Sequence, residues 1–273
     1  MTTQSTGPYL FHKPEIDRGL VAQVGSAAGV SDEIIDAALT AVTSGRVFGL
    51  EMSGKIVSGK DTIGPGVLAE LGVHGYTHLM FAKALKHEFN VIMNHLRAAD
   101  TPRQAQDVLE GMDLPPYGSA QLIELLWDHV RENVALTATD RTPPIRSGLI
   151  MLGTDIRREQ NINYWVNISI AEALGEMAQG HSLMYTDARF PNEIDLAKAV
   201  GIYSVRLDIS ADTQRRRLWE RDGLEPDPAA LSHISETALD GYTGFDLVVD
   251  NNGTAQEGID AVLAVLDPSL IHA

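Results

Sequence analysis

Residues 46–62 read RVFGLEMSGKIVSGKDT, and the rest of the chain can be placed around this stretch. Its apolar run, residues 47–52, has the length and composition of a buried parallel strand. The residues from Gly54 to Lys60 then fit the pattern G-x-x-x-x-G-K, and a helical pattern follows them. Strand, glycines, lysine and helix in this order predict a loop that binds phosphate groups. A plain glycine-rich turn between a strand and a helix is the alternative.

Phosphate binding needs this composition for physical reasons. Gly54 and Gly59 let successive backbone N–H groups curl around a phosphate without clashes from a Cβ atom. Lys60 adds a mobile cation, and the following helix turns the positive end of its dipole toward the same phosphate. One position departs from the pattern, because Asp61 stands where Ser or Thr is usual and Thr62 comes next.

Composition and charge narrow the classes of partner. The chain has 273 residues, a net charge of −16 and a pI of about 4.8. Such an acidic chain is unsuited to a large nucleic-acid surface or to an anionic membrane, so we expect neither as a partner. An anionic substrate must instead be attracted by a local group of Lys and Arg. The chain has no cysteine, which excludes disulfides and thiolate metal sites.

The sequence carries no targeting signal that we can identify. No apolar run is long enough to span a bilayer, and the N-terminus lacks the pattern of a secretory signal. A cytoplasmic protein is therefore the expectation.

Apolar runs and helical patterns alternate after the first strand, which predicts an α/β fold with a parallel sheet flanked by helices. Further strands are expected at residues 181–186, 203–209 and 247–249, and helices at 62–71, 161–179, 193–200, 212–221 and 254–266. Residues 1–45 are expected to form a helical extension that packs on the core, with a helix at 32–44 and disorder at 1–7. Residues 46–273 form the main domain. Within it, residues 76–150 are expected to be a helical insertion with helices at 76–96 and 121–136 and a mobile segment at 101–117.

Charged residues follow the second expected strand. Asp187 comes directly after residues 181–186, at the sheet edge where ligands of parallel sheets collect. It is suited to holding Mg²⁺ through water or to accepting a hydrogen bond from a substrate, and a solvated loop aspartate is the alternative. Arg189 is suited to clamping a phosphate through two N–H groups. An ion pair between Arg189 and Glu193 is equally compatible with their spacing.

Four arginines, Arg215, Arg216, Arg217 and Arg221, gather on the helix expected after the third strand. Arg217 and Arg221 lie four residues apart and share a helix face. They suggest a polyphosphate clamp within a lid at about residues 210–240, although a solvated charged face explains them equally well. The aromatic pair Tyr164 and Trp165 has the spacing of core residues, and Thr154 or Asp155 is suited to capping a helix.

Several segments together resemble the deoxynucleoside monophosphate kinases of tailed bacteriophages. They are the loop G-x-x-x-x-G-K-D-T, Phe81-Ala-x-x-Leu-Lys86, Arg146 with Leu152-Gly153-Thr154-Asp155 and Tyr164-Trp165-Val166, Asp187-Ala-Arg189 with Glu193, His233-Ile-Ser-Glu236, and residues 246–253. These segments occur in the family's order from residue 46 to about 266, which is more specific than any one motif.

The resemblance implies a P-loop NTPase fold that transfers the γ-phosphoryl group of ATP to a deoxynucleoside 5′-monophosphate. The products are ADP and a deoxynucleoside diphosphate for DNA synthesis, and Mg²⁺ is the implied cofactor. The location would be the host cytoplasm if the protein is phage-encoded. ATP is expected at Gly54, Ser58, Gly59, Lys60, Asp61, Thr62, Arg217 and Arg221. The acceptor is expected at Lys86, Arg146, Gly153, Thr154, Trp165, Asp187, Arg189 and Glu193.

The resemblance also gives catalytic roles to Lys60, Asp187 and Arg189. Thr62 and Asp187 are the expected Mg²⁺ residues, in part through water, and Asp61 leaves open whether Thr62 or a water takes the usual hydroxyl position. Two alternatives stay open. Arg217-Leu-x-x-Arg221-Asp222 resembles the lid of dephospho-coenzyme A kinase, and an ATP-binding regulatory module needs no catalysis. A homodimer is also left open.

Overall fold

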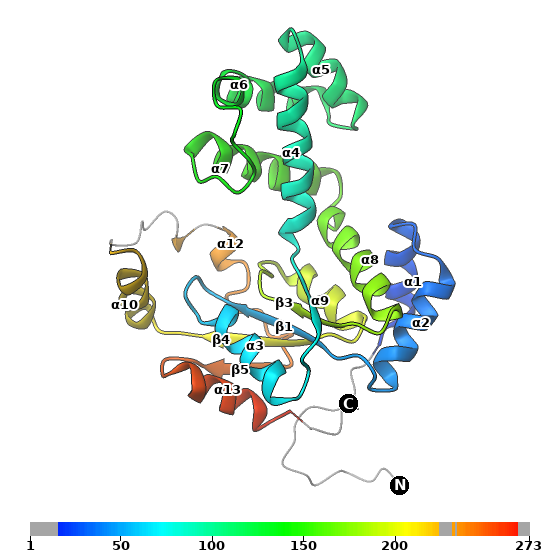
Figure 1. Ribbon diagram of the computed structural model, residues 1–273, viewed down its shortest axis with the longest axis vertical. Helices are drawn as coiled ribbons and strands as arrows, with labels where there is room; N and C mark the ends of the chain where they lie inside the picture. Colours follow the sequence, from blue (N-terminus) through cyan, green and yellow to red (C-terminus); the bar gives the residue numbers. More distant parts are fainter. Residues whose placement is uncertain (1–15, 224–230, 233, 267–273) are drawn as a thin grey trace. The chain divides into compact units, whose positions relative to one another are not determined.

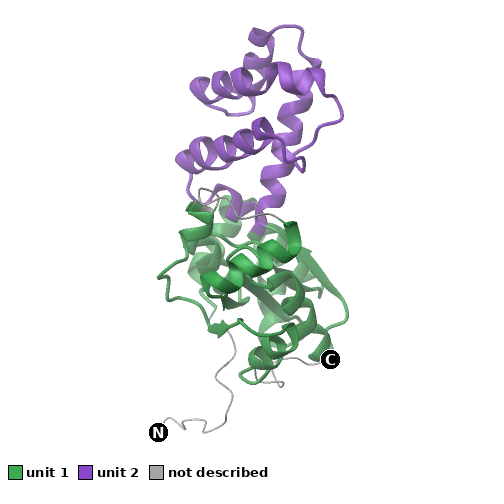
Figure 2. Ribbon diagram, turned by 90° about the vertical axis from the view of Figure 1, so that its left-hand side faces the viewer, with its two compact units in different colours: residues 1–80, 170–273 green, residues 81–169 purple. Residues whose placement is uncertain are grey.

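A computed structural model describes residues 16–223, 231–232 and 234–266 of the chain. It divides into two compact units (Figure 2). Unit 1 takes in residues 1–80 and 170–273, and unit 2 is the continuous segment Phe81–Ser169. Residues 1–7, where we expect disorder, lie outside the described residues.

Unit 1 is built on a parallel sheet of five strands, so the expected α/β class is confirmed (Figure 1). The strands are β1 (Gly49–Gly54), β2 (Tyr76–Leu79), β3 (Ser182–Tyr185), β4 (Tyr203–Asp208) and β5 (Leu247–Asp250). Their order across the sheet is β2-β3-β1-β4-β5, and every neighbouring pair is parallel. Since β1 is central and fully buried, the residues that follow it emerge in the middle of the sheet's carboxyl edge.

Helices cover the sheet of unit 1. They are α1 (Arg18–Ala27), α2 (Asp32–Thr43), α3 (Lys60–Glu70), α9 (Pro191–Ala199), α10 (Ala211–Asp222), α12 (Ile234–Thr237) and α13 (Ala255–Leu263), together with the latter part of α8 (Tyr164–Ala178). On one face, Leu50 and Met52 of β1 pack with apolar residues of α3 and α13. Side chains alternate along a strand, so Glu51 and Ser53 face the opposite side of the sheet.

The secondary structure of unit 2 is helical in the residues that the structure describes. It contains α4 (Ala82–Ala98), α5 (Pro102–Gly111), α6 (Pro116–Glu132), α7 (Pro143–Ile150), the π-helix η1 (Met151–Arg158) and the beginning of α8. Its core is one apolar cluster that includes Phe89, Ile92, Met93, Leu122, Leu126, Leu152 and Trp165. Among the described helices of both units, none is both long and apolar enough to cross a membrane.

Two local expectations were wrong. Residues 76–96 do not form one helix, because residues 76–79 are the edge strand β2 and α4 begins at Ala82. Residues 101–117 are ordered and contain α5. Thr101 caps this helix by accepting a hydrogen bond from the Gln104 N–H at 3.2 Å, and Pro102 occupies its first turn. Proline is compatible with a first turn, where its missing N–H would have no partner, so the prolines of this region begin helices. The helical segment expected at 76–150 accordingly corresponds to residues 81–169.

Glu51 is an unusual residue for the centre of a sheet. Its side chain is fully buried, and neither carboxyl oxygen has a hydrogen-bond partner among the described residues. Burial raises the pKa of Glu51 well above its ordinary value, and the nearby carboxylates Glu193 and Asp187 raise it further, whereas Arg206 lowers it. Glu51 therefore holds a proton in the folded protein under conditions in which it ionises in the unfolded chain.

This proton makes stability depend on pH. When the folded pKa is raised, stability falls as pH rises above the ordinary value of about 4.3, because only the unfolded chain releases the proton. Glu51→Gln has no ionisable group at this position, so the variant does not lose stability in this way as pH rises. We expect the unfolding free energy of the variant to rise relative to that of the wild type from about pH 5 to about pH 8. Urea unfolding at both pH values measures this difference.

The exposed residue Glu70 on α3 provides a matched control. Glu70→Gln removes a carboxylate that lies in contact with solvent, and so controls for the loss of one acidic group. An unfolding free energy of Glu51→Gln that keeps a constant difference from the wild type across this range would contradict the assignment of a buried proton to Glu51.

Candidate active site at the carboxyl edge of the sheet

The loop between β1 and α3, residues 54–60, is here called the glycine loop. Its backbone is tightly constrained at both glycines. A Cβ atom at Gly54 would collide with the Ser58 hydroxyl and lie 2.8 Å from the Leu207 carbonyl oxygen. Gly59 has a φ of 97°, and a Cβ atom there would lie 2.8 Å from Asn251 Nδ2. Both positions therefore need glycine, as the sequence pattern predicts.

Three successive carbonyl groups of the glycine loop are held from outside. Side-chain donors reach them in the following pairs: Gln214 Nε2 to Ile56 O (3.3 Å), Arg217 Nη1 to Val57 O (3.3 Å) and Asn251 Nδ2 to Ser58 O (2.6 Å). The C=O and N–H groups of a trans peptide point in opposite directions, and no cis peptide occurs in the described chain. The N–H groups that follow Ile56 and Ser58 thus face the inside of the loop. Such an array of inward N–H groups can bind an anion.

Lys60 brings a positive charge to the glycine loop. It is the first residue of α3 and is only 7% exposed. Burial lowers the pKa of the Lys60 ammonium, as does Arg189, while Asp61, Glu236 and Asp187 oppose this. Asp61 itself is exposed on the first turn of α3. The positive N-terminus of α3 adds to the attraction of an anion toward the loop.

Asp187 and Arg189 follow β3, which lies beside β1. Tyr185 is level with Glu51 in the register, so Asp187 is level with Ser53, one residue before the glycine loop. The Arg189 guanidinium pairs with Glu236 at 2.6 Å. The expected alternative, a pair between Arg189 and Glu193, is not what the structure shows.

The side chain of Glu193 holds the segment after Asp187 in place by accepting backbone N–H groups. Its carboxylate accepts the N–H of Arg189 at 2.6 Å and that of Phe190 at 3.1 Å, and the residue is buried. Glu193 thus fixes the chain between Arg189 and the start of α9.

The arginines of α10 differ from one another. Arg217 donates to Val57 and Ser58 of the glycine loop and, at 2.9 and 2.8 Å, to the carbonyl oxygens of Asn251 and Gly253. Arg221 instead makes an exposed two-bond pair with its neighbour Asp222. In the structure Arg217 therefore braces the loop, whereas Arg221 lies in the solvated face. Residues 224–230 of the expected lid lie outside the described residues.

The remaining acceptor candidates belong to unit 2. Lys86 is on α4, Arg146 is exposed on α7, and Gly153 and Thr154 are in the π-helix η1. Trp165, which the resemblance places at the acceptor, lies in the core of unit 2 instead. It is 3% exposed within the apolar cluster of unit 2, and its indole N–H donates to the Gly153 carbonyl oxygen at 3.0 Å. A ring enclosed in this way offers no free face for stacking, so the helical periodicity around Trp165 gave the correct interpretation.

Sequence reasoning missed residues that reach the site from distant segments. Gln214, Glu236 and Asn251 all contact the glycine loop, yet they lie more than 150 residues along the chain from it. Glu236 and Asn251 fell within segments of the family resemblance, which was the one signal that could have marked them.

The part of the chain that the structure describes contains no group of three His, Asp or Glu residues arranged to hold a metal ion. Thr62, in the first turn of α3, and Asp187, at the same sheet edge, carry side-chain oxygens of the kind that Mg²⁺ prefers. Mg²⁺ commonly takes one or two protein ligands together with water and phosphate oxygens, so these residues fit that cation.

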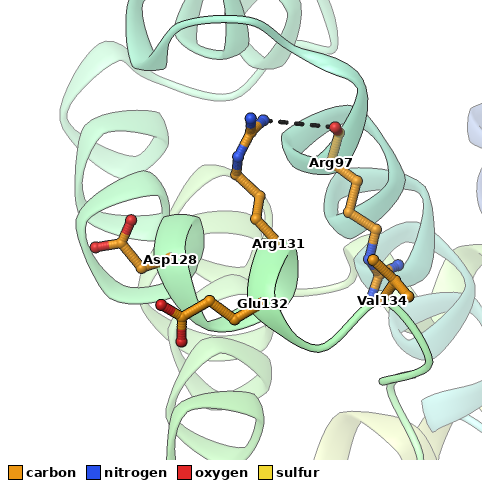
Figure 3. Close-up of a pocket in the computed structure, with 5 residues that line it drawn as sticks. All are labelled: Arg97, Asp128, Arg131, Glu132 and Val134. Carbon is orange, nitrogen blue, oxygen red and sulfur yellow. Dashed lines mark hydrogen bonds between the residues drawn. The ribbon is translucent and has the colours of Figure 1, made fainter.

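A separate pocket of about 360 Å³ lies in unit 2, lined by Arg97, Asp128, Arg131, Glu132 and Val134 (Figure 3). Its two guanidinium groups are occupied by backbone carbonyls. Arg97 donates to Val130 and Leu136, and Arg131 donates to Leu96, Arg97 and Ala99. These contacts close the ends of α4 and α6, and we assign no ligand to the pocket.

A scan against protein-family models found no matching family, and a search of curated proteins found no similar sequence. Function must therefore be inferred from the residues and their geometry.

The bracing role of Arg217 leads to a prediction. Arg217→Ala removes four hydrogen bonds to backbone carbonyls, so the glycine loop should open more often. We expect hydrogen exchange of the peptide that covers residues 54–60 to become about tenfold faster, since bonds to a charged donor are worth more than about 1 kcal/mol. Arg221→Ala is the control and should leave this exchange unchanged. Equal exchange in the two variants would show that Arg217 does not support the loop.

The buried location of Trp165 leads to a prediction about the stability of the protein. Trp165→Ala should lower the free energy of unfolding by about 3–5 kcal/mol, because it leaves a cavity in the core of unit 2. Trp219, which is 56% exposed on α10, is the matched control, and Trp219→Ala should have little effect. Urea unfolding of both variants measures the difference. A stable Trp165→Ala protein would return this ring to the list of ligand-binding candidates.

Proposed function

We propose that this protein is a P-loop kinase that transfers the γ-phosphoryl group of ATP to a deoxynucleoside 5′-monophosphate. The observation that carries the proposal is the glycine loop, with three successive carbonyls held from outside and Lys60 at its end. Such a loop is suited to the β- and γ-phosphates of a nucleoside triphosphate. Its position after the central strand of a parallel sheet is where nucleotides bind in this class of fold.

The groups around the loop suit phosphoryl transfer. Such a reaction needs positioning and neutralisation of charge more than covalent help. The loop N–H groups and Lys60 would hold the donor phosphates and stabilise the charge that grows during transfer. Asp187 would orient the acceptor, and Arg189 would bind a phosphoryl oxygen. Mg²⁺, when bound near Thr62 and Asp187, would neutralise further phosphate charge.

The choice of a deoxynucleotide as acceptor rests on the family resemblance. Lys86, Arg146, Gly153 and Thr154 of unit 2 are the residues that we propose contact this acceptor. Trp165 is not included, because its ring is buried in the core. Glu193 is proposed as a positioning residue that acts through the backbone of Arg189.

A single assay separates this proposal from its alternatives. The purified protein is incubated with ATP, Mg²⁺ and either each of the four deoxynucleoside monophosphates or dephospho-coenzyme A. We expect ADP to form with at least one deoxynucleotide and not with dephospho-coenzyme A. Transfer to dephospho-coenzyme A alone would establish that alternative, and ATP binding without transfer to any acceptor would indicate a regulatory module.

Lys60 allows a direct test of the loop assignment. Lys60→Met should reduce transfer at least about a hundredfold, because it removes a donor that faces the charge developing on the transferred group. Lys55→Met is the matched control, since Lys55 lies in the same loop but pairs with Asp240 at 2.9 Å. Steady-state kinetics of both variants, with circular dichroism to confirm folding, give the comparison. Near-normal turnover in folded Lys60→Met would remove the basis for the phosphate assignment.

A further inference from the structure

Glu236 connects two groups that the proposed reaction needs. One carboxylate oxygen accepts the backbone N–H of Ile56, in the glycine loop, at 2.9 Å. The other pairs with Nη1 of Arg189 at 2.6 Å, and the Glu236 side chain is only 12% exposed. All three residues belong to unit 1, and Glu236 reaches the loop from the short helix α12.

The two donors that Glu236 occupies are typical phosphate ligands. A loop N–H before a helix N-terminus and an arginine guanidinium both bind phosphoryl oxygens strongly, because the hydrogen bonds involve charge. A carboxylate offers the same chemistry with two anionic oxygens. Glu236 also contributes to the field at the Lys60 ammonium, where it opposes the lowering of that pKa. The carboxylate therefore supplies negative charge to a site built for an anion.

We propose that the Ile56 N–H and the Arg189 guanidinium form a binding position for a γ-phosphoryl oxygen of ATP. Glu236 fills this position in the nucleotide-free protein and is displaced when ATP binds. This inference rests on the proposed function.

The γ-phosphoryl group is the ligand that fits both donors. Ile56 belongs to the loop assigned to the phosphate donor, whereas Arg189 is among the residues assigned to the acceptor. The group that passes from donor to acceptor is the one expected to touch both sets. Two anions that share the same pair of hydrogen-bond donors repel one another. The Glu236 carboxylate and the γ-phosphoryl group therefore cannot occupy this position at once.

If Glu236 instead positioned Arg189 for catalysis, its removal would have a different effect on the affinity for ATP. If Glu236 remained in place and only oriented Arg189, its removal would weaken ATP binding or leave it unchanged. If Glu236 competes with the γ-phosphoryl group, its removal strengthens ATP binding. ADP lacks this group and should respond much less.

The test compares the affinities of ATP and ADP by isothermal titration calorimetry. Glu236→Ala should bind ATP about tenfold more tightly than the wild type, since the competing anion held charge-assisted hydrogen bonds, while its affinity for ADP changes little. Glu236→Gln removes the charge and keeps the shape, so it should show the same selective gain to a smaller extent and serves if the alanine variant does not fold. Glu176→Gln is the matched control, because Glu176 bonds to Thr77 and His181 at the amino edge of the sheet.

Other results of the titrations would reject different parts of the proposal. Unchanged or weaker ATP binding in both folded Glu236 variants would reject the displacement of Glu236 and leave the kinase proposal intact. An equal gain for ATP and ADP would reject the assignment to the γ-phosphoryl group. Absence of binding of either nucleotide to the folded wild type would reject the proposed function, and this inference with it.

Discussion

The site depends on the side-chain hydrogen bonds that reach the carbonyl groups of the glycine loop from outside. Val57 has a φ of 59°, which is unfavourable for a β-branched residue, so the loop needs support from its surroundings to keep this shape. That support comes from Gln214, Arg217 and Asn251, which lie on α10 and directly after β5. The strand order, in which β4 lies beside β1 and β5 beside β4, is thus also what shapes the loop.

Charge balance is the second constraint, because the chain carries a net charge of −16 and the proposed ligands are anions. Lys60 and Arg189 supply positive charge at the carboxyl edge, and Glu236 offsets it. Glu51 lies on the strand that leads into this edge, and an ionised Glu51 would add negative charge near Asp187 and Glu193. The raised pKa of Glu51 keeps that charge off the sheet, which favours an anionic ligand.

Local patterns were sufficient to predict much of the fold. The strands β1, β3, β4 and β5 are short apolar runs with turn residues after them, and the sequence located all four. The missed strand, β2, lies at the sheet edge, where only Leu79 of its four residues is buried. An edge strand with polar, half-exposed side chains has no apolar run to mark it, and its pairing with β3 is a long-range property that periodicity does not report.

In the candidate site too, the sequence predicted the local features and missed the long-range contacts. The glycines and Lys60 followed from a local motif, since a loop of this shape needs those residue types at fixed spacing. Spacing did not determine what each charged group contacts. Arg189 had a carboxylate four residues away in Glu193, yet it pairs with Glu236, and Glu193 instead accepts two backbone N–H groups. Which carboxylate a guanidinium reaches is set by the fold and not by spacing along the chain, and the pair with Glu236 directs Arg189 toward the glycine loop.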